Sequence, residues 1–238
     1  MNIIHYVNVV HNSSDRLTRR RLARRDRLLE LALQLIDAEG LPGLTMARLA
    51  GRAGLAVGAL YRTFPGKGAL LVALQARAIA GLEAEVRQEV SAADAALPAK
   101  LKPRRRSLRL LLAALRPFLE SHRRSPARHR LIDDLLSAPE ALLSADELAE
   151  VNAALAPLLR AVVDQLDAAA KAGALEAGSG PLRARVLWAA LHGLDHLRKR
   201  DRGEPRALRS PALSAELLRA LLVGFGARPA DVDEVNLA

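Results

Sequence analysis

Apolar residues recur at helical spacing along most of this chain, and glycine or proline interrupts them at short intervals. The first run follows the i, i+3, i+4 spacing of one helix face, at Leu22, Leu29, Ala32, Leu33 and Ile36. Gly40 and the pair Pro42–Gly43 end this run, and the pair Pro65–Gly66 ends a later one. Aromatic residues make up only 3% of the chain, whereas the helix-favouring alanine, leucine, arginine and glutamate are abundant. The pattern predicts an all-α fold.

The same breaks predict about nine helices, with three helices leading into a helical bundle. Ser14 is expected to cap the first helix, Thr45 the second, and Ser144 with Glu147 forms a capping box for a later one. The expected ranges are 14–39, 45–53, 56–64, 67–90, 104–122, 125–137, 144–171, 181–200 and 213–225. Residues 91–103 are expected to form a linker. We also expect a kink at Pro117 and a bend or division at Pro157.

The length and composition exclude several classes of protein. A chain of 238 residues with 50% hydrophobic residues is able to bury a core, which excludes a disordered protein. The absence of cysteine excludes a disulfide framework and thiol-based metal sites or catalysis. No apolar stretch approaches the roughly 20 residues that span a bilayer. We expect a soluble, cytoplasmic protein in which residues 1–14, a poor match to a signal peptide, form a flexible leader.

Positive charge is concentrated near the N-terminus. The chain has a net charge of +10, and residues 15–27 contribute seven arginines and two aspartates, a net of +5. Two interpretations of this charge remain open, an arm that lies on a polyanion and a solvated face of the first helix. Because 31 of the 36 basic residues are arginine, a bias in the coding sequence is a further source of the excess.

The segment from Leu49 to Leu60 meets the requirements of a helix-turn-helix. Ala50 is small enough for two helices to cross closely, and Gly54, four residues later, is able to take a positive φ at the turn. Leu55 and Leu60 close the core between the helices. The motif alone is moderately specific, since a helical hairpin with a glycine turn need not bind DNA.

The residues around this motif resemble the N-terminal domain of the TetR/AcrR family of bacterial regulators. The resemblance covers residues 20–74 and includes the string from Leu60-Tyr61 through Phe64 and Lys67 to Leu70-Leu71. Farther along, Trp188, His192 and Gly193 are similar to a W-x-x-x-H-G helix found in one group of that family. The resemblance implies a DNA-binding domain at 15–66 and a ligand-binding and dimerisation domain at 67–238.

The resemblance assigns residues 56–63 to a recognition helix in the major groove. It places Val57, Ala59 and Arg62, with Ala47 on the preceding helix, toward base edges, and Arg62 is the candidate for a guanine contact. The full predicted DNA-binding set is Arg20, Arg24, Thr45, Ala47, Val57, Gly58, Ala59, Tyr61, Arg62, Thr63 and Lys67. Ala56, Val57 and Thr63 depart from the family pattern, and Ala56 removes a helix cap. We expect Phe64 to be a core aromatic residue.

The resemblance also implies a homodimer that binds a small-molecule effector. The predicted dimer interface lies on the last two long helices, at Leu187, Ala190, Leu191, Leu194, Leu217, Leu218, Leu221 and Leu222. Ala190 and Gly193 are expected to permit close approach. The candidate residues for a pocket that suits a hydrophobic or amphipathic effector are Leu111, Leu115, Phe118, Leu135, Leu158, Val162 and Trp188.

Other clusters of polar residues are interpreted as structural. His192 and His196 have a spacing that is able to hold a metal, but no glutamate completes an HExxH motif, so we predict no metal site. The pair Asp133–Asp134 and the run Arg104–Arg106 are interpreted as surface charges. The sequence contains no nucleophile–base pair and no phosphate-binding glycine loop. We therefore expect that the protein is not an enzyme and has no cofactor.

Two functional hypotheses remain from the sequence. The first is a dimeric transcriptional repressor that binds a palindromic operator on double-stranded DNA and is released by an effector. The second is a helical protein that binds DNA or an acidic partner through its basic arm without sequence preference.

Overall fold

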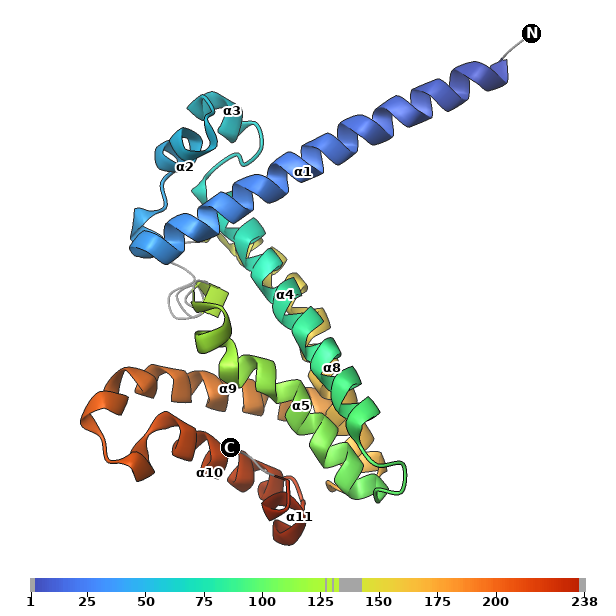
Figure 1. Cartoon of the computed structure of the whole chain (residues 1–238), viewed down its shortest axis with the longest axis vertical. Coiled ribbons are helices and arrows are strands. Elements are labelled where there is room, and N and C mark those ends of the chain that lie inside the picture. The colour runs from blue at the N-terminus through green and yellow to red at the C-terminus, as the bar shows by residue number, and fades with distance from the viewer. Residues whose placement is uncertain (1–2, 127, 130, 133–142, 236–238) are drawn as a thin grey trace. The chain divides into compact units, whose positions relative to one another are not determined.

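The computed structural model describes residues 3–126, 128–129, 131–132 and 143–235. These residues contain helices and no strand, which confirms the predicted all-α class. The helices are α1 (Ile3–Gly43), α2 (Met46–Ala53), α3 (Val57–Tyr61), α4 (Lys67–Ala96), α5 (Pro103–Arg124), α8 (Ala145–Lys171), α9 (Gly180–Leu197), α10 (Ser210–Gly224) and α11 (Pro229–Asp233) (Figure 1). Two short 3₁₀ helices, Arg198–Gly203 and Arg206–Leu208, join α9 to α10. Much of the helix predicted at 125–137, with Leu135 and Asp133–Asp134, lies outside the described residues.

The chain forms two compact units. The first contains Met1–Arg77 and Pro126–Val151, and the second contains Ala78–Ser125 and Asn152–Ala238. The predicted division between residues 66 and 67 therefore differs from the structural one, which falls inside α4. The reason is that the first turns of α4 bury Leu70, Leu71 and Leu74 in the first unit.

Helix α1 is longer than predicted. It begins at Ile3, so neither a helix start at Ser14 nor a break after the expected leader of residues 1–14 is found. The stretch from Ile3 to Glu39 contains no glycine or proline that would end a helix. The predicted break at Gly40 is confirmed, because this residue has φ 74° and ψ 175°. Leu22, expected to face inward, is 56% exposed because α1 extends past the core.

The core of the first unit is made of large side chains from α1 to α4. The buried set includes Leu28, Ile36, Leu44, Leu49, Leu60, Phe64 and Leu74. Arg77 of α4 donates hydrogen bonds to the carbonyl oxygen of Asp26 at 2.8 Å and to the Glu30 carboxylate at 3.1 Å. These bonds fix α1 against the start of α4.

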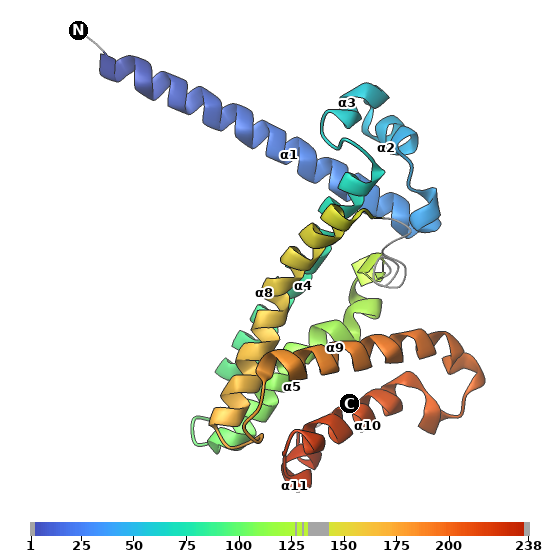
Figure 2. The ribbon, with the colours of Figure 1, turned by 180° about the vertical axis from the view of Figure 1, so that it is seen from behind.

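The second unit is a bundle in which α9 and α10 lie side by side (Figures 1 and 2). Its core combines α5, α8, α9, α10 and α11 and is rich in leucine and alanine. The predicted division at Pro157 is wrong, because α8 continues through this residue. Likewise, α4 extends to Ala96, so that the predicted linker shortens to residues 97–102.

Ion pairs secure the ends of α5. Arg124 bonds both Glu89 of α4 and Glu120, and the hydrogen bond to Glu89 is the main cause that raises the pKa of Arg124. The Arg104–Arg106 run is likewise paired, Arg105 with Glu234 at 2.7 Å and Arg106 with Asp94 at 2.6 Å. These arginines therefore act as structural surface charges, as predicted. Among the described residues, no helix is long and apolar enough to cross a membrane.

Candidate nucleic-acid interface and effector cavity

The turn between α2 and α3 is built as the sequence predicts. Thr45 caps α2, since its hydroxyl oxygen accepts a hydrogen bond from the Arg48 amide at 3.2 Å. Gly54 has φ 67°, and the Leu55 amide donates to the Ala50 carbonyl at 2.9 Å across the turn. Ala50 is fully buried, so the two helices are able to approach closely at this point.

Helix α3 spans Val57–Tyr61 and is shorter than the predicted range 56–64. The amides of Thr63 and Phe64 both donate to the Leu60 carbonyl, at 2.8 and 2.9 Å, which turns the chain toward α4. Phe64 is 1% exposed, which confirms its place in the core. Ala56 precedes α3 without a side-chain cap, also as predicted.

One face of α3 is exposed and includes a position without a side chain, Gly58. Val57 is 41% exposed, Tyr61 is 47% exposed, and Arg62 at the end of the helix is also exposed. A Cβ added to Gly58 would meet no atom within 4 Å, so packing does not require a glycine there. Ala59, expected to face base edges, is half-buried, as is Thr63. Val57, Gly58, Tyr61 and Arg62 therefore form the accessible surface of α3.

The arginines of α1 lie on more than one face of the helix. Arg21 and Arg25 precede Leu29 by eight and four residues and thus continue the row of core positions toward the N-terminus. The Arg25 guanidinium lies 5.0 Å from the centre of the Phe64 ring, an arrangement that favours a cation–π contact. The predicted Arg20 and Arg24 are exposed on other faces. Arg25, one of the seven arginines of the basic segment, is absent from the predicted DNA-binding set, although its spacing from Leu29 was a usable signal.

Further exposed side chains surround α2 and the start of α4. Thr45, Ala47 and Lys67 are exposed, and Lys67 is the first residue of α4, where the free backbone amides and the helix dipole favour an anion. Arg48 and Arg52 are exposed on α2 and were not predicted. Arg48 is paired with Glu39.

The second unit contains a small apolar cavity. Its volume is about 30 Å³, and Leu115, Phe118, Leu158, Val162 and Trp188 of the predicted set line it. Leu111 is fully buried in the bundle core and does not line the cavity, and Leu135 lies outside the described residues. Seven further residues on α4, α5, α8 and α9 line the cavity and were not in the predicted pocket set: Leu82, Val86, Ala114, Leu159, Ala184, Leu187 and Leu191.

Aromatic rings gather beside this cavity. The ring centres of Phe118 and Trp188 are 5.6 Å apart, and those of Trp188 and His192 are 4.3 Å apart. The Nδ1 atom of His192 lies 3.1 Å from the Trp188 carbonyl oxygen. His192 thus takes part in packing, and the described residues contain no cluster of three or more side chains suited to a metal.

The predicted dimer residues do not share one exposed surface. Leu187, Leu191, Leu218 and Leu222 are at most 4% exposed and belong to the bundle's own core, so they present no free surface to a partner. Ala190, Leu194, Leu217 and Leu221 are half-buried. The exposed apolar side chains of α9 lie on another face, at Leu182, Val186, Ala189 and Leu197, together with Gly193.

Comparison with known proteins identifies the first unit most directly. Residues 28–74 match the model of the tetR family of bacterial regulatory proteins, a family of regulators rather than enzymes. The chain is 54% identical over 46 residues to the HTH-type transcriptional repressor DrrR1 of Streptomyces coeruleorubidus. This match covers 19% of the chain and 17% of that repressor, so it concerns a small part of each protein.

Solved structures share the fold over nearly the whole chain. RolR in complex with resorcinol has a TM-score of 0.63 and 17% identity, with 92% of this chain and 95% of that chain covered. AibR in complex with isovaleryl coenzyme A and operator DNA has a TM-score of 0.56 and 18% identity, over 86% and 100% of the two chains. At these identities the likeness concerns the fold. Residues 28–74 of this chain, which contain the helix-turn-helix of α2 and α3, are therefore similar to the tetR family of bacterial regulatory proteins.

Proposed function

We propose that the chain is a transcriptional repressor that binds operator DNA through α3. The observation that carries this proposal is the exposed face of α3, formed by Val57, Gly58, Tyr61 and Arg62 beside a buried core. A surface without bulk at Gly58 allows a close approach of the DNA. The repressor activity of the relative DrrR1 supports the same function.

The charges around α3 supply binding to the DNA backbone. Lys67 at the start of α4 and the hydroxyl groups of Thr45 and Tyr61 are suited to phosphate contacts. Arg25 lies over the ring of Phe64, so its position depends on the fold of the helix-turn-helix and its neighbouring helices. Arg62 is then the residue best suited to read a guanine, since Val57 offers an apolar contact alone.

Two copies of the chain are needed to read an operator of useful length. One short recognition helix reads few base pairs, and two such helices placed about 34–36 Å apart read successive major grooves of a palindrome. We place the dimer interface on the exposed face of α9 at Leu182, Val186, Ala189, Gly193 and Leu197, which recur at helical spacing. Ala190, Leu194, Leu217 and Leu221 are partly exposed and able to contribute at its edge.

The effector binds in the apolar cavity of the second unit. A volume of about 30 Å³ holds roughly one water molecule, whereas ligand pockets are on the order of 300–1,000 Å³. Effector binding therefore requires the helices that line the cavity to move apart, among them α4 with Val86 and α8 with Leu158 and Val162. Such a movement links an apolar effector to release from DNA.

Gel-shift titration of the chain against its own upstream DNA and a scrambled duplex tests the proposal. We expect preferential binding of the upstream DNA. Lys67→Ala should weaken binding to both duplexes and reduce the salt slope by about 0.9, because one phosphate contact is lost. Equal affinity for the two duplexes would contradict operator recognition.

The uncapped start of α3 and the exposed arginines of α1 favour one alternative, sequence-independent binding by the arm. Replacing Arg16, Arg19, Arg20 and Arg24 by glutamine separates the two functions. Under the main proposal this variant binds more weakly but still prefers the operator, whereas under the alternative it loses binding altogether.

A further inference from the structure

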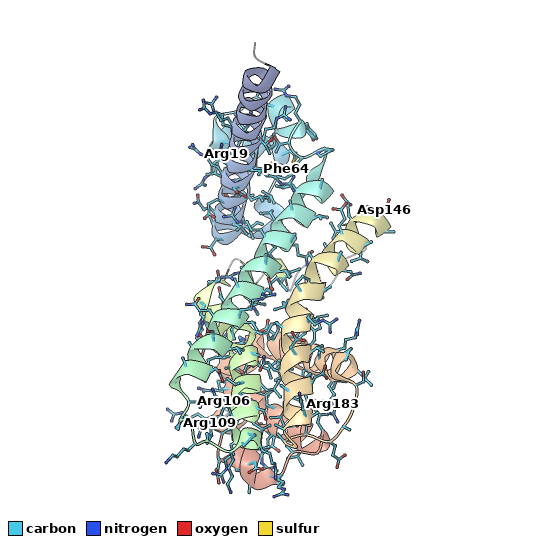
Figure 3. The ribbon with its side chains drawn as sticks, turned by 90° about the vertical axis from the view of Figure 1, so that its right-hand side faces the viewer. Arg19, Phe64, Arg106, Arg109, Asp146 and Arg183 are labelled. Atoms are coloured by element: carbon cyan, nitrogen blue, oxygen red, sulfur yellow. The ribbon has the colours of Figure 1, made fainter. Side chains whose placement is uncertain are left out.

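The second unit has a surface groove that is separate from the apolar cavity. The groove has a volume of about 460 Å³ and lies among α4, α5 and α8. Figure 3 views the side on which α4, in green, and α8, in yellow, run beside each other. Val86 lines both the groove and the cavity. Unlike the cavity, the groove already has the volume of a small-molecule site.

Four of the residues that line the groove are apolar. Val86 is buried, while Val90, Leu110 and Ala161 are partly exposed into it. These four residues come from three helices, so the apolar surface depends on the assembled bundle. A ligand with aliphatic side chains would cover them and gain free energy in proportion to the apolar area removed from water.

Charged residues on the two long helices of the groove differ in whether they already have partners. On α4, Arg87 is paired with Glu83 at 2.7 Å and Asp94 with Arg106 at 2.6 Å. On α8, the side chains of Arg160 and Asp164 make no ion pair or hydrogen bond with any residue that the structure describes. An arginine four residues before an aspartate is the less favourable order for a pair within a helix. The α8 wall therefore presents one available cation and one available anion.

We propose that this groove is a second ligand site, for a small zwitterion with apolar side chains such as a dipeptide. Arg160 and Asp164 are one helical turn apart, about 6 Å along α8. The amino and carboxylate ends of a dipeptide are separated by a similar distance, since an extended residue spans about 3.3–3.6 Å. The carboxylate then bonds Arg160, the amine bonds Asp164, and the side chains cover Val90 and Leu110. The site does not depend on DNA binding.

Calorimetric titration of the full chain with leucyl-leucine, without DNA, tests the site. Blocking either end of the dipeptide, as the N-acetyl derivative or the C-terminal amide, should weaken binding about two- to fivefold, because one ion pair to an exposed side chain is lost. Binding of the blocked and free dipeptides with equal affinity, or no binding of leucyl-leucine at 10 mM, would overturn the proposal.

Substitutions assign the two ends. In Arg160→Gln the amide and the free dipeptide should bind alike, and in Asp164→Asn the acetylated and free dipeptides should bind alike. The charge-exchanged variant, Arg160→Asp with Asp164→Arg, should recover binding with the ligand reversed. Arg109→Gln, an exposed change on α5 outside the groove, is the control and should bind as the unchanged chain does. Because no DNA is present, failure here leaves operator binding, measured by gel shift, unaffected.

Discussion

The helices α1–α3 with the start of α4, called the head here, and the bundle of the second unit bury their apolar residues in different ways. In the head, bulky side chains such as Phe64, Ile36 and Leu49 fill the core, and the short α3 keeps Val57 and Tyr61 exposed. In the bundle, leucines alternate with small residues such as Ala114 and Ala184, and a cavity remains between the helices. A tightly filled core suits a rigid DNA-binding surface, whereas a core of smaller side chains leaves room for rearrangement.

Similarity to known proteins follows the same division. The family model matches residues 28–74, which lie in the head, while RolR shares the fold over 92% of this chain at 17% identity.

The strongest test of the comparison is Phe64→Ala. This change removes a fully buried ring and the contact of Arg25, and should lower the free energy of unfolding by about 3–5 kcal/mol. Urea denaturation followed by circular dichroism measures the loss. Tyr61→Ala is the matched control, since Tyr61 is exposed and its loss should weaken DNA binding while stability stays nearly constant. A similar loss of stability in both variants would contradict the distinction between core and surface on α3.

On the bundle side, Leu218→Ala and Val186→Glu separate the core from the proposed dimer interface. Leu218→Ala should cost about 2–5 kcal/mol of unfolding free energy because it leaves a cavity. Val186→Glu places a charge on an exposed position and should convert a dimer to a folded monomer. Circular dichroism during denaturation measures the loss of unfolding free energy, and sedimentation velocity measures the change from dimer to monomer. Should Val186→Glu remain dimeric, the interface lies elsewhere than on this face of α9.

Arg62→Ala sharpens the assignment of base reading. Loss of a bidentate guanine contact should cost about 1–3 kcal/mol of binding free energy at selected operator positions. A competition gel shift with single-base operator variants locates those positions. An unchanged base preference would remove Arg62 from the reading surface.

Gly58→Gln tests whether the exposed glycine serves DNA rather than folding. Because a Cβ at this position meets no atom within 4 Å, stability should be unchanged or rise by up to about 1 kcal/mol from improved helix propensity. Operator affinity should fall about tenfold, since the added side chain keeps the DNA away. Reduced stability with normal DNA affinity would assign Gly58 to the fold instead.

The smallest expected effect is that of Ser144→Ala at the start of α8. The Ser144 amide and hydroxyl both donate to the Glu147 carboxylate at 2.9 Å, and the Glu147 amide donates to the Ser144 hydroxyl oxygen at 3.4 Å. Loss of this capping box should lower the unfolding free energy by about 1 kcal/mol. Thermal denaturation measures it, with Ser144→Thr retaining most of the stability. A variant as stable as the original would show that the cap is dispensable.

Local features of the fold were predictable from the sequence because neighbouring residues decide them. The cap at Thr45, the positive φ of Gly54 and the capping box of α8 each depend on residues within one helical turn. The start of α1 at Ile3 was not predictable, because residues 3–39 contain no glycine or proline that would mark a boundary of the helix. Five of the seven predicted cavity residues line the cavity, because α5, α8 and α9 present a single apolar side to it.

The sequence by itself determined the all-α class and the helix-turn-helix, because helical periodicity and turn chemistry are local properties. The candidate reading residues followed from the resemblance to the TetR/AcrR family. Only the tertiary structure decided which leucines of α9 and α10 are used internally. Leu187 and Val186 are adjacent and both apolar, yet the packing of α9 on its neighbours buries the first and exposes the second. The tertiary structure also brought Arg25 to Phe64, and α4 to α8 around the groove, since these contacts join residues far apart in the chain.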